Sequence, residues 1–218
     1  MKKNLYNKKY NIIAALLVVI AVFASLSYVL ERSNQQPKSK EEVLSLANQL
    51  YESTDGTAAV IVMENYLKNN RDDKEIATKL ASYYFMQKRY DDFLKIYQEN
   101  NLESVSLMNM SAAAHQAKGD TDNAIRIYKE AIEKYPRNTQ AYVSLSALYQ
   151  SLSNKTEALA IIEKGLTVLP NSSQLLVTAA SVAMKMGDNA VSAAYARRAL
   201  EIDGDNEQAS SILVAVGG

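Results

Sequence analysis

Residues 121–170, TDNAIRIYKEAIEKYPRNTQAYVSLSALYQSLSNKTEALAIIEKGLTVLP, contain one pattern of small residues and prolines twice. Ala124 and Ala158 are 34 residues apart, and so are Pro136 and Pro170. A fixed period of this length is typical of stacked helix–turn–helix units. The stretch therefore predicts an all-α fold in which every unit contributes a first helix (helix A) and a second helix (helix B).

The same phase continues in both directions along the chain. Between Tyr97 and Met108 the chain is three residues short of the period, which removes nearly one helical turn and predicts a short helix B there. The shortening fits either a tolerated deletion in a turn or a hinge. A small residue recurs in helix A at Ala47, Ala81, Ala112, Ser146 and Ala180. The predicted units are 40–73, 74–104, 105–138, 139–172 and 173–206, with a capping helix within 205–216.

Each unit resembles a tetratricopeptide repeat. In helix A of the fourth unit, Tyr142 and Leu145 hold the two bulky places of the family pattern. Ser146 holds the small place and Tyr149 the aromatic place. Ala158 holds the small place of helix B. The resemblance covers about residues 40–206, and it implies a right-handed α-solenoid of about five helix pairs.

Proteins of this family bind peptides or partner helices in a groove lined by helix A of each unit. The resemblance places a candidate protein-binding site at Tyr51, Phe85, Met86, Asn109, Gln116, Gln140, Gln150 and Lys185. Apolar anchors surrounded by polar groups suit a protein interface. A single lysine in the lining argues against a clamp for a C-terminal carboxylate. A groove that binds nothing stays open as an alternative.

An apolar segment lies near the N-terminus. Residues 12–30, IIAALLVVIAVFASLSYVL, are 19 positions without a charge, and four lysines precede them within residues 1–11. A helix of this length spans roughly 28 Å, close to the hydrocarbon thickness of a bilayer. We expect a single-pass transmembrane signal-anchor helix, with residues 1–11 in the cytoplasm. A linker over 31–39 then leads to the repeats of 40–218 on the extracytoplasmic side.

The alternative for this segment is a cleaved secretory signal. Such signals have an apolar region of about 7–15 residues that ends at small residues. Ala24 and Ser27 offer weak cleavage sites of that kind, although the apolar run continues to Leu30. This alternative gives a soluble secreted or periplasmic protein that self-associates, so a homo-oligomer is compatible with the sequence.

Composition argues against several classes of function. Beyond residue 30 the chain carries 20 basic and 24 acidic residues, a net charge of −4, which disfavours nucleic acid as a partner. The chain has no cysteine, and its one histidine, His115, holds an aromatic place of the third unit and is expected to pack there. We therefore expect no metal, no cofactor and no enzymatic activity.

These observations favour a non-catalytic scaffold or adaptor, anchored in the membrane of a bacterium, that binds partner proteins or peptides outside the cytoplasm. Its predicted context is envelope protein assembly or secretion. An envelope enzyme is the remaining alternative, and no constellation of catalytic residues supports it.

Overall fold

The described part of the computed structural model covers residues 39–53 and 56–217. Within these residues the chain forms eleven helices and no strand, which confirms the all-helical prediction. The helices are α2 (Lys40–Ser53), α3 (Thr57–Asn69), α4 (Lys74–Met86), α5 (Tyr90–Glu99), α6 (Val105–Ala117), α7 (Thr121–Lys134), α8 (Thr139–Ser151), α9 (Lys155–Val168), α10 (Ser173–Met186), α11 (Asn189–Ile202) and α12 (Glu207–Val216).

Polar residues recur at the helix A starts. Each of them accepts a backbone hydrogen bond from the first turn with its side-chain oxygen, which satisfies a donor that would otherwise lack a partner. At the start of α2, the Ser39 hydroxyl accepts a bond from the Glu42 amide at 3.2 Å. The later N-cap residues are Asp73, Ser104, Asn138, Ser172 and Asn206.

The turns from helix A to helix B contain one residue in the left-handed conformation. The residues are Gly56, Lys88, Gly119, Ser153 and Gly187, with φ between 59° and 85°. This conformation ends helix A and reverses the chain. Glycine adopts it without a steric cost, whereas Lys88 and Ser153 adopt it against the preference of a side chain with a Cβ atom.

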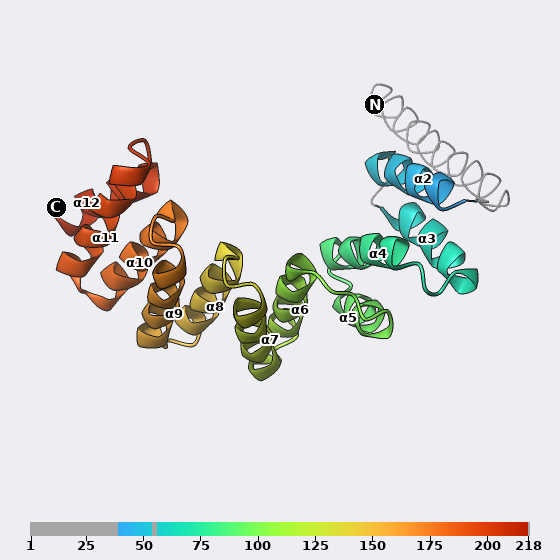
Figure 1. The fold of residues 1–218 in the computed structure, drawn as a ribbon, viewed down its shortest axis with the longest axis horizontal. Coiled ribbons are helices and arrows are strands. Elements are labelled where there is room, and N and C mark those ends of the chain that lie inside the picture. The colour runs from blue at the N-terminus through green and yellow to red at the C-terminus, as the bar shows by residue number, and fades with distance from the viewer. Residues whose placement is uncertain (1–38, 54–55, 218) are drawn as a thin grey trace, which may run out of the picture. The chain divides into compact units, whose positions relative to one another are not determined.

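The chain divides into two compact parts. The first ends at Gln87; in it α3 packs against α2 and α4 around Val43, Ala47, Ala59 and Met63, which are buried. The second comprises residues 88–217, in which α5 to α12 pack in series, each helix against the next or the next but one. Figure 1 shows α5 to α12 of the second part following one another in chain order.

Close helix crossings depend on the small residues that set the period. Ala158 is fully buried, and the Ser146 hydroxyl donates a hydrogen bond to its carbonyl oxygen at 2.8 Å. One unit later the roles are exchanged, because the Ser192 hydroxyl of helix B donates to the Ala180 carbonyl of helix A at 2.9 Å. A serine can replace alanine here because its hydroxyl is small and finds an acceptor on the facing helix.

The predicted short helix B is present. Helix α5 has 10 residues, compared with 13 or 14 in α3, α7, α9 and α11. Helix α12 lies within the predicted capping segment and packs on α10 and α11 through Ala209 and Ile212.

The predicted membrane helix at 12–30 lies outside the described residues. Among the residues that are described, every helix is too short or too polar to cross a bilayer.

Candidate protein-binding surface

The residues predicted to bind a partner fall in both compact parts. Tyr51, Phe85 and Met86 lie in the first part, at the ends of α2 and α4. The other five lie on the A helices of the second part, α6, α8 and α10.

Tyr51 belongs to an aromatic pair. Its ring stacks on that of Tyr83, with centroids 4.3 Å apart and planes inclined by 26°. The ammonium group of Lys79 lies 5.4 Å from the Tyr83 ring centroid, within range of a cation–π interaction. Burial raises the pKa of the Tyr83 hydroxyl. Sequence reasoning identified Tyr51 but missed Tyr83 and Lys79, which join it only through packing.

Met86 lies beside this pair and is the exposed member of the group. Its side chain is 57% exposed, and the Tyr51 hydroxyl donates a hydrogen bond to its sulfur at 3.4 Å. Phe85 is half-buried. Gly56 lies close to the Tyr51 ring, since a Cβ atom at this glycine would be only 2.7 Å from ring carbon Cδ2. The first part thus presents a flexible thioether next to a fixed aromatic pair.

Asn109, on α6, has a buried polar atom. Its Nδ2 atom donates to the Asn138 Oδ1 atom at 3.0 Å, while that oxygen also accepts a bond from the Ala141 amide. The Asn109 amide must therefore present its nitrogen to Asn138. Its own Oδ1 atom is buried and accepts no hydrogen bond from any described residue. Such an oxygen is a candidate acceptor for a water molecule.

The remaining predicted residues form short polar contacts. Gln140 donates to the Ser144 hydroxyl at 3.0 Å, and Lys185 donates to the Gln150 side-chain oxygen at 2.8 Å. Gln150 and Lys185 come from successive A helices, so this bond joins α8 to α10. Gln116 is exposed near the end of α6. The structure thus brings together Tyr51 with Met86, and Gln150 with Lys185.

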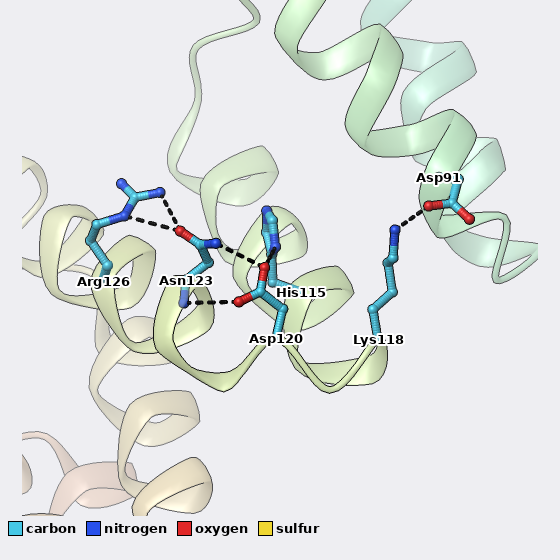
Figure 2. A network of polar contacts seen from close by, with 6 residues as sticks. All are labelled: Asp91, His115, Lys118, Asp120, Asn123 and Arg126. Atoms are coloured by element: carbon cyan, nitrogen blue, oxygen red, sulfur yellow. Dashed lines mark hydrogen bonds and ion pairs between the residues drawn. The ribbon is translucent and has the colours of Figure 1, made fainter.

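His115 takes part in a polar network at the turn between α6 and α7 (Figure 2). Its Nδ1 atom lies 2.9 Å from an Asp120 carboxylate oxygen, and Asp120 also caps α7. The side-chain hydrogen bond from Asn123 and the contact with His115 together hold the pKa of Asp120 below its usual value. Lys118, three residues after His115, forms an ion pair with Asp91 of α5. The contact between His115 and Asp120 thus links the end of α6 to the N-cap of α7.

Potential metal ligands do not cluster within the part of the chain that the structure describes. No group of three or more potential ligands among histidine, aspartate and glutamate occurs within residues 39–53 and 56–217. The carboxylates near His115 are engaged in capping and ion pairs instead.

Comparison with known sequences identifies the repeat. Residues 115–180 and 173–206 each match a sequence model of the Tetratricopeptide repeat family. BBSome complex member BBS4 of Bos taurus is 29% identical over 155 residues, which are 70% of this chain and 30% of that protein. The chain spans 30% or less of the length of the curated relatives it matches.

Comparison with solved structures agrees on the fold. A tetratricopeptide repeat protein from Parabacteroides merdae superimposes with a TM-score of 0.64 at 16% identity, covering 81% of this chain and 73% of that one. YrrB, described as a TPR protein with an unusual peptide-binding site, gives a TM-score of 0.58 at 13% identity, covering 84% and 96%. At these identities the likeness establishes the fold alone.

The 34-residue period, the buried small residues and the match to the family models all indicate stacked helical repeats. The models that match describe a structural repeat, and neither of them names an enzymatic family. Residues 115–206 thus match models of the tetratricopeptide repeat, and the described residues fold into an all-helical solenoid like those of solved tetratricopeptide repeat proteins.

Proposed function

We propose that this protein is a non-catalytic, membrane-anchored scaffold that binds a partner protein or peptide on the extracytoplasmic side, in envelope protein assembly or secretion. The observation that supports partner binding most directly is the exposed Met86 side chain beside the Tyr51–Tyr83 stack. Methionine adapts its shape to an apolar partner, and fixed aromatic rings lose little conformational entropy on binding.

The energetics of protein interfaces favour the first-part group, Tyr51, Phe85 and Met86, as the anchor of an interface. Interface anchors are enriched in aromatic residues, and truncating one commonly costs about 2 kcal/mol, roughly thirtyfold in affinity. The predicted residues of the second part are amides and one lysine, which supply hydrogen bonds around an interface rather than its apolar centre.

Two variants test partner binding. Replacing Tyr51→Ala together with Phe85→Ala removes both aromatic anchors, and Met86→Glu places a charge on the exposed thioether position without removing the stacked rings. We expect both to lose the proteins that crosslink to the wild type in intact cells, identified by mass spectrometry. The matched control is Lys129→Ala on the exposed side of α7, which should retain every partner.

Circular dichroism should show unchanged helicity in all of these variants. If folded Met86→Glu and the folded double variant both capture the same partners as the wild type, binding through this group is excluded.

The membrane anchor is proposed from the sequence alone. An uncharged run over residues 12–30 that follows four lysines supports a spanning helix with its N-terminus in the cytoplasm. In a bacterial expression host, we expect the protein to sediment with membranes and to resist extraction by alkaline carbonate. Protease added to intact spheroplasts should then digest the repeats.

If the repeats were protected from protease in intact spheroplasts, the proposed orientation would be wrong. A shortened chain in the soluble periplasmic fraction, with a new N-terminus near Ala24 or Ser27, would instead establish a cleaved signal.

A further inference from the structure

Two lysines join the ends of three helices at one edge of the second compact part. Lys185, near the end of α10, donates to the Gln150 side chain near the end of α8 at 2.8 Å. Lys155, at the start of α9, donates to the Lys185 backbone carbonyl at 2.6 Å. Both ammonium groups therefore lie at the edge formed by the turns from helix A to helix B.

The positive charges of these lysines are not neutralised within the described chain. An ammonium group has three donors, and the acceptors observed here are one amide oxygen and one carbonyl oxygen, both neutral. The acids nearest in sequence are Glu157 and Asp188, and neither lies within ion-pair distance of them. Asp188 instead accepts a hydrogen bond from the Val191 amide.

Two apolar side chains accompany the lysines. Leu152 is 41% exposed and Met186 is 42% exposed, and they hold the same place in successive units, 34 residues apart. The third unit has Lys118 at this place, so the fold does not require an apolar residue there. Leu152, Lys155, Lys185 and Met186 together are called the basic–apolar edge.

An acidic segment with complementary character lies at the other end of α10. Its carboxylates form no ion pair with described residues, and Ile202 between them is 45% exposed. The Asn206 amide donates to the Ser173 hydroxyl at 3.2 Å, which fixes the segment at the first residue of α10. This acidic edge consists of Glu201, Ile202, Asp203, Asp205 and Glu207.

The two edges cannot meet within one copy. Lys185 is close to the last residue of α10 and Ser173 is the first, so a helix of 14 residues, about 20 Å, separates them. A second copy displaced along the direction of α10 would bring its acidic edge against the basic–apolar edge of the first.

We propose that the basic–apolar edge binds the acidic edge of a second copy of this chain, giving a head-to-tail assembly. Opposite charges face one another in this contact, and Leu152 and Met186 meet the exposed Ile202. Such a contact uses two different surfaces, so each copy keeps one of each free and the assembly can lengthen. This inference goes beyond the proposed function and does not depend on it.

Other occupants fit less well. Binding to an anionic membrane surface takes a cluster of about four to eight lysines or arginines, whereas this edge has two. Nucleic acid requires a strongly basic surface, and the isoelectric point of the chain is about 6.6.

Charge-reversal variants of the full-length protein provide the test, with sedimentation velocity as the readout. One variant carries Lys155→Glu and Lys185→Glu, and the other carries Glu201→Lys and Asp205→Lys. We expect the wild type to form larger species as its concentration rises at low salt, and to dissociate at high salt because exposed charges are screened. Each variant alone should associate at least roughly tenfold more weakly, because it brings like charges together.

Mixing the two variants should restore assembly, because each then meets a partner of opposite charge. The control with Lys129→Glu and Lys164→Glu makes the same change in net charge as the variant with Lys155→Glu and Lys185→Glu, at exposed sites elsewhere, and should assemble like the wild type. A wild type that stays monomeric at all concentrations, or variants that assemble as it does, would overturn the proposal. So would a mixture of folded variants that remains monomeric.

Discussion

Gly165 lies where three helices of the second part pack together. It lies on α9, and a Cβ atom there would be 3.0 Å from side-chain atoms of Tyr142 on α8 and Leu175 on α10. Both of these side chains are almost completely buried. Their atoms therefore have little room to move away from an added methyl group.

Gly165→Ala tests this packing. Alanine in a helix is favoured over glycine by about 1 kcal/mol, whereas overpacking a core costs about 1–3 kcal/mol. Because the neighbours are fixed, we expect a net loss of about 1 kcal/mol in the free energy of unfolding, measured by urea denaturation. The control is Gly204→Ala, where the nearest atom to a new Cβ would be 3.9 Å away. Equal stability of the two variants would show that the helices are farther apart at Gly165.

Tyr195 offers a test by titration. Burial, together with a 2.8 Å hydrogen bond to the Glu163 carboxylate, raises the pKa of its hydroxyl to about 12. The protonated form is favoured in the folded state, so this contribution to stability is present below pH 10 and is lost as the pH rises from about 10 to 12.

Absorbance of tyrosinate should reveal the late titration. The difference between the wild type and Tyr195→Phe is expected to show a transition near pH 12. In the Glu163→Gln background the same difference should move to lower pH, because the negative charge that opposes ionisation is gone. A difference transition near the ordinary pKa of about 10 in the wild type would contradict the contact.

At the scale of the element, the reciprocal serines show how a helix pair fixes its register. Ser146 faces Ala158 in the fourth unit, and Ser192 faces Ala180 in the fifth, so each crossing has one serine and one alanine. Both combinations keep the two helices close. A larger side chain on either helix would have to push them apart.

Ala158→Phe tests this crossing. We expect a loss of about 1–3 kcal/mol from overpacking, seen as a lower melting temperature of the full-length protein. Ala160→Phe lies two residues away on the exposed side of the same helix and should leave the melting temperature almost unchanged. If both substitutions had the same effect, the proposed register of α9 would be wrong.

The helices were predictable from the sequence because their signals are local and repeat. Ser172 and Asn206 cap helices one period apart, and the small residues of each crossing recur at the same interval. The missing three residues also had a local consequence, the short α5.

The surface was predictable only in part, because its contacts join residues of different units. Nothing in the sequence indicates that Tyr83 stacks on Tyr51, or that Asn109 donates to Asn138, since these contacts depend on how side chains orient after packing. The exposed pair Leu152 and Met186 could have been found from the sequence, since both residues are apolar at equivalent places near a polar turn.

At the scale of the molecule, stability should vary along the stack. In repeat proteins the free energy is approximately a sum of terms for each unit and each interface between neighbours. Helix α10 buries seven of its side chains and packs against α8, α9, α11 and α12. Helix α5 has ten residues and is followed by Asn101 in the left-handed conformation.

Hydrogen exchange should report this gradient. We expect the slowest amide exchange within residues 88–217 in α10, and faster exchange in α5, when the full-length protein is followed by mass spectrometry under native conditions. Uniform protection from α5 to α12 would mean that the second part unfolds as one cooperative block.

The serial packing of α5 to α12 has a consequence for how the chain folds. Each helix contacts the next one or two along the sequence, so bringing it into place closes only a short loop, and the entropy lost in closure grows only with the logarithm of loop length. Folding can begin at any well-packed pair and spread in both directions, at rates typical of proteins with local contacts. A force applied to the two ends of the second part would accordingly release it one helix pair at a time.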